Sequence, residues 1–416
     1  MPLYGLLVTL LSPFVALWIA LKPRGRIRLS ERFGFWKPLS LGETYCWFHA
    51  ASVGEVKGLK PVITKYRQAY PAEKILLTIT STTALQEASS MADEVRLLPF
   101  DAPCFYALAV KKVKVSKVIV TETELWPGLL SFLAWRRIPV AWVNARMAEA
   151  TVQRYRQIRW LFGRLLQNLA CVIAIDAVNA ERFGAVGIPK ERITVIPNSK
   201  YDRVPYAPDV LRQKIAVTQK KERVVTIGNL RSQEALHVLS AVIPFAQDML
   251  LFIVPRHPES FPVIQQMLIE LLSTRDQADL LIDSATYRVS PRLTGIVFMN
   301  EFGVLEALYA QSGMAISAGS FHEAYQGHNL LEAAPYKVFL VTGMYNQSSE
   351  EIACKLVQED AIVVLNDPAA LQDVIAQFLR EPSYVTPLVQ RYYDFAAKFR
   401  GASTRIIERL KEVIPS

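Results

Sequence analysis

Short apolar runs alternate with longer amphipathic stretches along most of this chain. Between residues 44 and 176 the apolar runs are rich in β-formers and only four to seven residues long: "TYCWFHA", "KILLTIT", "VRLLPF", "KVIVTE", "PVAWVNA" and "CVIAID". Runs of this kind are typical of strands buried in a parallel sheet. Helical stretches such as 56–70 and 151–168 lie between them, and "ITVIPNSKYD" closes the series near residue 202. This order predicts a doubly wound α/β sheet.

The alternation stops over residues 203–222, which hold Pro205, Pro208 and the charged run "QKKER", and this stretch is predicted to be a linker. It then resumes with "RVVTIGN", "LLFIVPRHP", "GIVFMN", "GMAISAGS", "VFLVT" and "AIVVLN", and ends in an amphipathic helical stretch. A chain of 416 residues is too long for one ordinary core. We therefore predict two Rossmann-like domains facing a cleft. Neither contains GxGxxG or GxxxxGK[ST], which argues against a nicotinamide or P-loop nucleotide site.

The N-terminal residues 2–21 carry no charge, and an apolar segment of about 20 residues is long enough to span a membrane. Pro13 leaves open a helix that lies in the interface. Six basic residues and one acid follow between positions 22 and 37, which by the positive-inside rule predicts that this side is cytoplasmic. The alternative is a buried N-terminal helix with a solvated basic turn. Five of the cations are predicted to contact membrane or acceptor phosphates: Lys22, Arg24, Arg26, Arg28 and Arg32.

Charge and cysteine usage narrow the class of protein. The net charge of +9 fits an anionic membrane, and no helix-turn-helix, zinc-finger or RNP-like pattern supports nucleic acid as a partner. The four cysteines form no CxxC pair, which argues against a zinc ribbon or a disulfide framework. His322 and His328 flank Glu323, but their spacing is a weak metal pattern. No metal or cofactor is predicted.

Polar residues gather where the predicted strands end, which is the edge at which parallel sheets bind ligands. They follow the strands of both series: residues 52–55, 80–83, 122–126, 144–146, 198–202, 256–257, 317–320 and 327–329. Glu55 has two interpretations at this edge. It can be a stabilising acid in a first helical turn capped by Ser52, or a reactive carboxylate.

The order of these motifs resembles the 3-deoxy-D-manno-octulosonic acid (Kdo) transferases. The blocks "FHAASVGE", "ETELWPGLL", "NARM", "PNSKYD", "VPRHPESF" and "GHNLLEAA" carry the resemblance up to about residue 355. It implies a GT-B fold and transfer of Kdo from CMP-Kdo to a lipid A precursor (lipid IVA) on the cytoplasmic face of the bacterial inner membrane. The implied organisation is a membrane anchor over 1–22, an acceptor domain over 23–205, a CMP-sugar donor domain over 206–385 and a helical segment over 386–416.

The resemblance also implies roles for individual residues. Glu55 matches the family's general base, and Glu122 and Lys200 match residues assigned to transition-state support. Because phosphate is a good leaving group, one base suffices, and the reaction is expected to invert the anomeric centre without a metal. A helix start near Asn329 is expected to aim N–H groups at an anion. The implied donor-binding residues are Pro255, Arg256, His257, Phe302, Gly303, Val304, Gly327, His328, Asn329, Leu330, Leu331 and Glu332.

The chain departs from the family pattern at several points. The "GEL" block reads "FGVL", "THxGEE" reads "NLRSQEA" and "RGGHN" reads "YQGHN". These departures leave two alternatives open: a GT-B enzyme that uses a UDP-sugar as transferase or epimerase, and a non-catalytic membrane-tethered homologue. At single sites, Glu122 can instead be a partner of Arg146 or Lys200, and Arg256 can pair with an acid.

Overall fold

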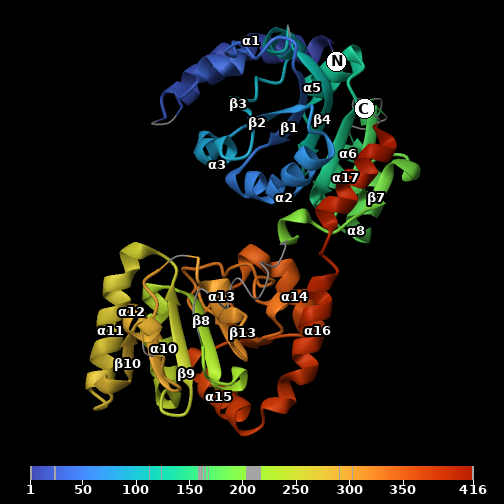
Figure 1. Cartoon of the computed structure of the whole chain (residues 1–416). Coiled ribbons are helices and arrows are strands. Elements are labelled where there is room, and N and C mark those ends of the chain that lie inside the picture. Colours follow the sequence, from blue (N-terminus) through green and yellow to red (C-terminus); the bar gives the residue numbers. More distant parts are fainter. Residues whose placement is uncertain are drawn as a thin grey trace. The chain divides into compact units, whose positions relative to one another are not determined.

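The computed structural model describes residues 2–22, 25–111, 113–122, 124–157, 163, 165–166, 168–202, 217–289, 291–301 and 303–414. The chain divides into two compact units (Figure 1). Unit 1 comprises Met1–Arg203 together with Phe399–Ser416, and unit 2 comprises Val204–Lys398.

Unit 1 is built on a seven-stranded sheet in the order β3-β2-β1-β4-β5-β6-β7, in which every recorded strand pair is parallel. The strands are β1 (Thr44–Ala50), β2 (Lys74–Ile79), β3 (Glu94–Leu97), β4 (Lys114–Thr121), β5 (Val140–Ala145), β6 (Leu169–Ala174) and β7 (Ile193–Val195). The strand order reverses between β1 and β4. In a doubly wound sheet this switch point is where ligands bind, outside the carboxyl ends of the strands.

Helices cover both faces of this sheet. They are α1 (Pro2–Ala20), α2 (Val53–Ala69), α3 (Leu85–Ser89), α4 (Pro103–Ala109), α5 (Pro127–Arg136), α6 (Glu149–Gln157), α8 (Ala177–Ala185) and α17 (Ala402–Val413). Alternate residues of β1 explain the two layers: Trp47 packs into a core with α4 and α5, whereas Cys46 and Phe48 pack into a core with α2 and α17. All three side chains are fully buried.

Unit 2 repeats this plan in a second seven-stranded parallel sheet, in the order β10-β11-β9-β8-β12-β13-β14. Its strands are β8 (Val224–Leu230), β9 (Leu250–Pro255), β10 (Leu281–Asp283), β11 (Gly295–Phe298), β12 (Met314–Ser317), β13 (Phe339–Gly343) and β14 (Val363–Leu365). Its helices are α10 (Ser232–Val242), α11 (Phe261–Ser273), α12 (Ser284–Val289), α13 (Leu305–Tyr309), α14 (Glu350–Gln358), α15 (Leu371–Arg380) and α16 (Thr386–Ala397). Here the switch point lies between β8 and β12.

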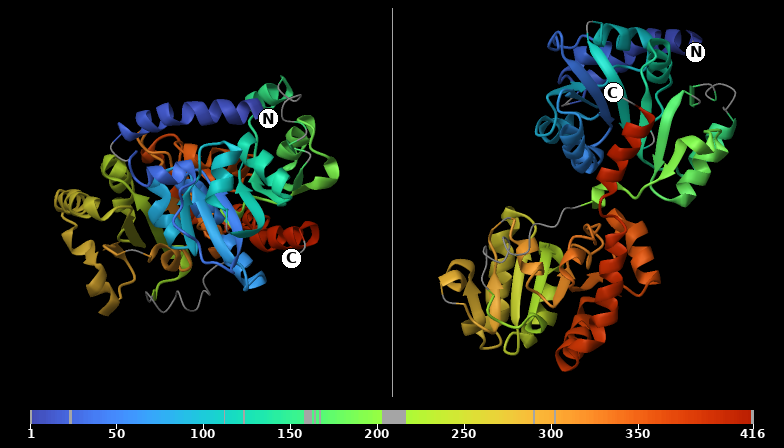
Figure 2. Two further views of the ribbon diagram at one scale, coloured as in Figure 1. Left: turned by 90° about the horizontal axis from the view of Figure 1, so that it is seen from above. Right: turned by 45° about the vertical axis from the view of Figure 1, so that its right-hand side comes forward.

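The predicted pair of parallel-sheet α/β domains is therefore confirmed, with differences in detail. The short edge strand β10 was not predicted from the sequence. The C-terminal stretch 386–416 contains two helices, of which α16 belongs to unit 2 and α17 to unit 1. Figure 2 shows the chain returning to unit 1 at its end. α17 lies beside α2, and its Ile406 and Leu410 are buried in the core of unit 1.

The N-terminal helix corrects one prediction. In the described part of the chain no helix is both long enough and apolar enough to cross a membrane, so the predicted spanning anchor is not supported. α1 packs on unit 1 through a narrow stripe in which Gly5 touches Pro103 and the Thr9 hydroxyl lies 3.4 Å from the Cys104 sulfur. Ser12 and Ala16 continue this stripe and are buried. One face of the helix is thus occupied by protein.

Candidate functional site

Glu55 lies in the first turn of α2, directly after β1 at the switch point of the first sheet. Ser52 is the N-cap, and its hydroxyl accepts a hydrogen bond from the Glu55 amide at 3.3 Å. The carboxylate itself accepts from the Ala51 amide at 2.8 Å and from the Ser52 hydroxyl at 2.9 Å. Burial is the largest effect on the pKa of Glu55 and raises it, against the lowering by these two donors. The capping role and a reactive carboxylate therefore coexist in one residue.

Glu122 follows β4, the neighbour of β1 across the switch point. Its backbone is in the left-handed region (φ 57°), which is uncommon for a residue other than glycine and is found at functional sites. Arg146 donates to one oxygen of the Glu122 carboxylate through Nε (3.0 Å) and Nη2 (2.8 Å). The alternative in which Glu122 pairs with Arg146 is thus present. Both Glu122 and Arg146 affect the pKa of Glu55, the acid raising it and the cation lowering it.

Glu124 is a third carboxyl at this edge, which sequence analysis did not single out. Burial, followed by the charges of Glu55 and Glu122, raises the pKa of Glu124 to about 7. Trp126 lies beside it, and its indole acts against this rise by lowering the pKa of Glu124. The sequence signal for Glu124 was the second glutamate of "ETELW". Its place in the site could not be recognised without knowing that β1 pairs with β4, because this pairing brings the residues after β4 close to Glu55.

Lys200 is placed by two of the predicted motifs together. It lies in a short 3-10 helix, Ser199–Tyr201. Asn144, at the end of β5, donates to the Ser199 hydroxyl at 2.9 Å and accepts from the Ser199 amide at 2.9 Å. The Ser199 hydroxyl in turn donates to the carbonyl of Gly58 at 3.1 Å. These contacts hold the lysine beside α2, one turn after Glu55.

Of the predicted phosphate-contacting cations, Arg24 lies outside the described residues. Lys22 lies over the ring of Trp18 at 3.6 Å, and Arg26 donates to the carbonyl of Ala20. Arg32 is half-buried and donates to the carbonyl of Thr80 at 2.7 Å. Burial lowers the pKa of Arg32.

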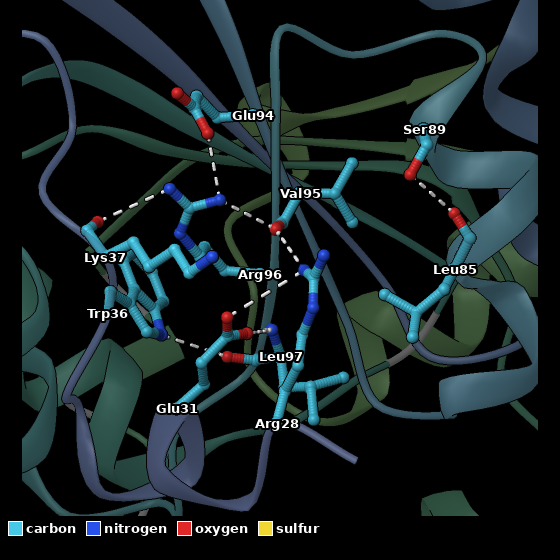
Figure 3. A network of polar contacts seen from close by, with 10 residues as sticks. All are labelled: Arg28, Glu31, Trp36, Lys37, Leu85, Ser89, Glu94, Val95, Arg96 and Leu97. Atoms are coloured by element: carbon cyan, nitrogen blue, oxygen red, sulfur yellow. Dashed lines mark hydrogen bonds and ion pairs between the residues drawn. The ribbon is translucent and has the colours of Figure 1, made fainter.

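Arg28 belongs to a polar network that attaches the N-terminal segment to β3 (Figure 3). It donates to the Val95 carbonyl at 2.9 Å and lies 3.8 Å from the carboxylate of Glu31. Glu31, which is buried, accepts from the Leu97 amide at 2.8 Å. Arg96 pairs with Glu94 at 2.8 Å in the same network. Part of the predicted cationic surface therefore has a structural role.

The second candidate site lies at the carboxyl edge of unit 2, where Arg256 follows β9. Its guanidinium donates to the Asn229 side chain at 3.1 Å, and its amide donates to the Leu230 carbonyl at 3.0 Å. Among the described residues Arg256 forms no ion pair with an acid, so the structural alternative for this residue is not observed. The next residue, His257, accepts from the guanidinium of Arg231 at 2.9 Å.

Glu234 organises the loops around these arginines, although its stretch "NLRSQEA" departs from the family pattern. It is 1% exposed and accepts from the backbone amides of Arg231 and Phe321, both at 3.0 Å, and from that of Gly319. Burial raises the pKa of this carboxyl. Gly319 has a positive φ (73°), and a Cβ there would lie 2.5 Å from Nε2 of His328. The glycine therefore leaves the space that the histidine ring uses.

The block at residues 327–332 corrects a second prediction, because no helix starts near Asn329. The Asn329 side chain accepts from the Leu331 amide at 3.1 Å in a local turn. The next element is a short 3-10 helix at Ala334–Tyr336, which has Pro335 in its first turn. Leu330 and Leu331 are 1% and 5% exposed, so their side chains serve the core. Burial raises the pKa of the Tyr309 hydroxyl, the charge of Glu332 raises it further, and the charge of Arg256 lowers it.

The remaining predicted donor residues are less informative. Phe302 lies outside the described residues. Gly303 has a positive φ (75°), and Val304 is buried before the first residue of α13. Pro255 ends β9, and the Gly327 amide donates to the Gly319 carbonyl at 2.8 Å. Within the described residues no group of three or more histidine, cysteine or acidic side chains is arranged to hold a metal ion.

The comparisons with known proteins agree with this architecture. The family of 3-deoxy-D-manno-octulosonic-acid transferases (Kdo transferases) matches residues 27–203. The chain is 30% identical to a 3-deoxy-D-manno-octulosonic acid transferase of Haemophilus influenzae, covering 98% of this chain and 97% of the relative. A UDP-GlcNAc 2-epimerase of Neisseria meningitidis is similar in structure (TM-score 0.56, 13% identity, 89% of this chain, 100% of the epimerase). So is a glycosyltransferase of Rickettsia africae (TM-score 0.52, 15% identity, 90% and 99%).

The two parallel-sheet α/β domains and the structural likeness to this epimerase and this glycosyltransferase support a GT-B fold. Within that class, the extent of the match to the Haemophilus relative is decisive. The chain belongs to the 3-deoxy-D-manno-octulosonic acid transferase family, and the resemblance read from its motifs is confirmed.

Proposed function

We propose that this protein transfers Kdo from CMP-Kdo to a lipid A precursor such as lipid IVA. The observation that carries the proposal is the carboxylate of Glu55 at the switch point of the first sheet, close enough to Glu122 and Arg146 to respond to their charges. A carboxylate whose pKa is raised by burial is a better proton acceptor than an ordinary one. Glu55 would remove the proton from the attacking sugar hydroxyl.

The donor half of the reaction falls to unit 2 in this proposal. Arg256 follows β9 without an acidic partner among the described residues, and a guanidinium presents a planar fork to phosphate. The leaving phosphate needs no acid to protonate it. A single displacement with inversion at the anomeric carbon follows, without a metal, and Lys200 offsets negative charge as the bond to phosphate breaks.

The acceptor is proposed to be reached at the cytoplasmic face of the bacterial inner membrane, with α1 lying on the bilayer rather than crossing it. Opposite its packed stripe, α1 exposes large apolar side chains, among them Leu10 (62%), Phe14 (71%) and Trp18 (59%). Lys22 and Arg26 lie at its C-terminal end. An apolar face beside cations is the arrangement expected of a helix that binds an anionic membrane surface.

Mass spectrometry of the lipid product tests this function. The purified protein is mixed with CMP-Kdo and lipid IVA, and a product heavier by a Kdo residue is expected. E55Q should slow its formation by roughly 10²–10⁴, the usual contribution of a general base. E350Q removes an exposed acid from the first turn of α14 and controls for a mere helix-terminus effect. Absence of a Kdo-bearing product, or wild-type turnover by E55Q, would overturn the proposal.

Binding competition separates the two alternative functions. CMP should displace a fluorescent CMP analogue from the protein at lower concentration than UDP does. Preference for UDP would favour a UDP-sugar enzyme instead. Binding of CMP without any turnover would favour the non-catalytic homologue.

A further inference from the structure

Two arginines follow neighbouring strands at the carboxyl edge of the sheet of unit 2, beside its switch point. Arg231 follows β8 and Arg256 follows β9, which are paired in parallel up to Leu230 and Pro255. Adjacent strands lie about 4.8 Å apart, so the two cations start from closely spaced backbone positions. The amide of Arg256 donates to the carbonyl of Leu230 at 3.0 Å, which connects the two strand ends.

Side chains other than carboxylates hold both guanidiniums. Arg231 donates to Nε2 of His257 at 2.9 Å and lies over the ring of Tyr325, 4.4 Å from its centroid. Arg256 donates to the carboxamide oxygen of Asn229 at 3.1 Å. Among the described residues neither arginine forms an ion pair with a carboxylate. Each guanidinium has five N–H donors, so most of them remain available to a ligand.

The acid nearest in sequence does not neutralise Arg231. Glu234 is buried, and its carboxylate is occupied by the backbone amides of Arg231, Gly319 and Phe321. The other histidine of this edge adds no charge, because burial, helped by both arginines, lowers the pKa of His328 to about 4. Nε2 of His328 is buried without a partner among the described residues. The edge therefore presents two cations to an anionic ligand.

Two of the departures from the family pattern lie at Arg231 and Tyr325. Where the pattern reads "THxGEE", this chain reads "NLRSQE", so that Leu230 replaces the histidine and Arg231 occupies the variable position. Where the pattern reads "RGGHN", this chain has Tyr325 at the position of the arginine. Arg231 and Tyr325 are in contact. The loop that lacks the arginine of the pattern therefore lies against Arg231, which supplies a cation at this place.

We propose that Arg231 is the specificity-determining residue for an acidic sugar: it binds the carboxylate of the donor sugar while Arg256 binds the phosphate. The inference rests on the proposed function. In CMP-Kdo the carboxylate is attached to the same carbon that bears the phosphate oxygen, so the two anionic groups are only a few bonds apart. Two arginines on adjacent strand ends match that spacing. A donor with a neutral sugar lacks the group that Arg231 binds, and this site selects against it.

Two measurements on the full chain test this assignment: the KM for CMP-Kdo and the Kd for CMP. In R231H the KM for CMP-Kdo should rise roughly 10- to 100-fold, because a charge-assisted contact to the carboxylate is lost. The Kd for CMP, which has no carboxylate, should change less than about threefold by calorimetry. The double variant R231H/Y325R returns the cation from the other loop and should restore KM to within about threefold of wild type. R275H, an exposed arginine of unit 2, is the control.

Two outcomes would be decisive against the assignment. Equal weakening of CMP and CMP-Kdo in R231H would make Arg231 a phosphate contact or a structural residue. A double variant no better than R231H would exclude exchange of the cation between the loops. R231Q, which removes the charge and keeps a polar hydrogen-bonding side chain, provides the same comparison if R231H is poorly folded. If the wild-type protein binds CMP but not CMP-Kdo, the proposed function itself fails, and this result does not depend on any variant.

Discussion

Both oxygens of the Glu55 carboxylate already accept a hydrogen bond before any substrate binds, yet the pKa of this group is raised. A base must be ionised to accept a proton, so activity should be lost as pH falls through the raised pKa of Glu55. The acid limb of kcat/KM is therefore expected above the ordinary glutamate value of about 4.3. It is measured from pH 4.5 to 8.

Two variants assign that limb to a residue. In E55Q the limb should disappear and the residual rate should be nearly flat. In E124Q it should persist, because Glu124 is placed as a neighbour rather than as the base. Since the pKa of Glu124 is raised to about 7, a limb that survives in E55Q and vanishes in E124Q would transfer the base role to Glu124.

His49 provides a stability prediction at the same scale. Its ring is fully buried in β1 and contacts the Thr78 carbonyl through Nδ1 at 3.1 Å, and burial lowers its pKa to about 4. The unfolded chain, with a pKa near 6.5, binds a proton more readily, so stability from neutral His49 is complete above pH 6.5 and is lost as pH falls toward 4. The contribution is about 3 kcal/mol.

Urea unfolding of unit 1 at several pH values measures this effect. The stability difference between wild type and H49N should shrink by about 1 kcal/mol per pH unit between pH 6.5 and 4.5. H237N, at an exposed histidine of unit 2, should show no such convergence. A pH-independent difference for H49N would contradict the assigned pKa.

At the scale of single elements, α1 has two faces with different chemistry. Small residues pack on α4, and large apolar residues face outward. Replacing Phe14 and Trp18 by Asp should leave the folded core intact and reduce binding to anionic vesicles at least tenfold in a flotation assay, because the inserted apolar area is lost. V263D, on an exposed position of α11, is the control. Unchanged flotation would reject α1 as the membrane contact.

The sequence pattern predicted an element correctly where an apolar run had the length of a buried strand. It failed where a local hydrogen bond favoured a different backbone conformation. "TYCWFHA" became β1 over the predicted residues, since every member from Tyr45 onward is buried. The predicted helix start at Asn329 was wrong, because the Asn329 side chain accepts from the Leu331 amide within a local turn. The left-handed backbone of Glu122 had no sequence signal, since glutamate rarely adopts it.

For the whole molecule, the sequence located strand ends but not their neighbours. Glu55 and Glu122 share a site because β1 pairs with β4, and Arg231 meets Arg256 because β8 pairs with β9. These pairings depend on packing between distant segments, which periodicity does not report. Likewise, the pattern at 386–416 showed helical amphipathicity without showing that α17 returns to unit 1. The family resemblance supplied the roles of individual residues, and the strand order explains why those residues meet.

Asp202 makes the return of α17 testable. It is 8% exposed and accepts from the amides of Gly401 and Ser403, both at 2.8 Å, and from the Ser403 hydroxyl. Asp202 lies where the chain leaves unit 1, two residues after Lys200. Its hydrogen bonds connect this point to Gly401 and Ser403, where the chain re-enters unit 1. D202A should leave the buried Ser403 amide and the half-buried Gly401 amide without an acceptor, and lower the stability of unit 1 by roughly 2–5 kcal/mol. Hydrogen exchange should rise in α17 and α2, which pack together, while the sheet of unit 2 stays protected.

D248A, at an exposed aspartate of unit 2, is the matched control. Faster exchange in unit 2 than in α17 would show that Asp202 does not hold this connection.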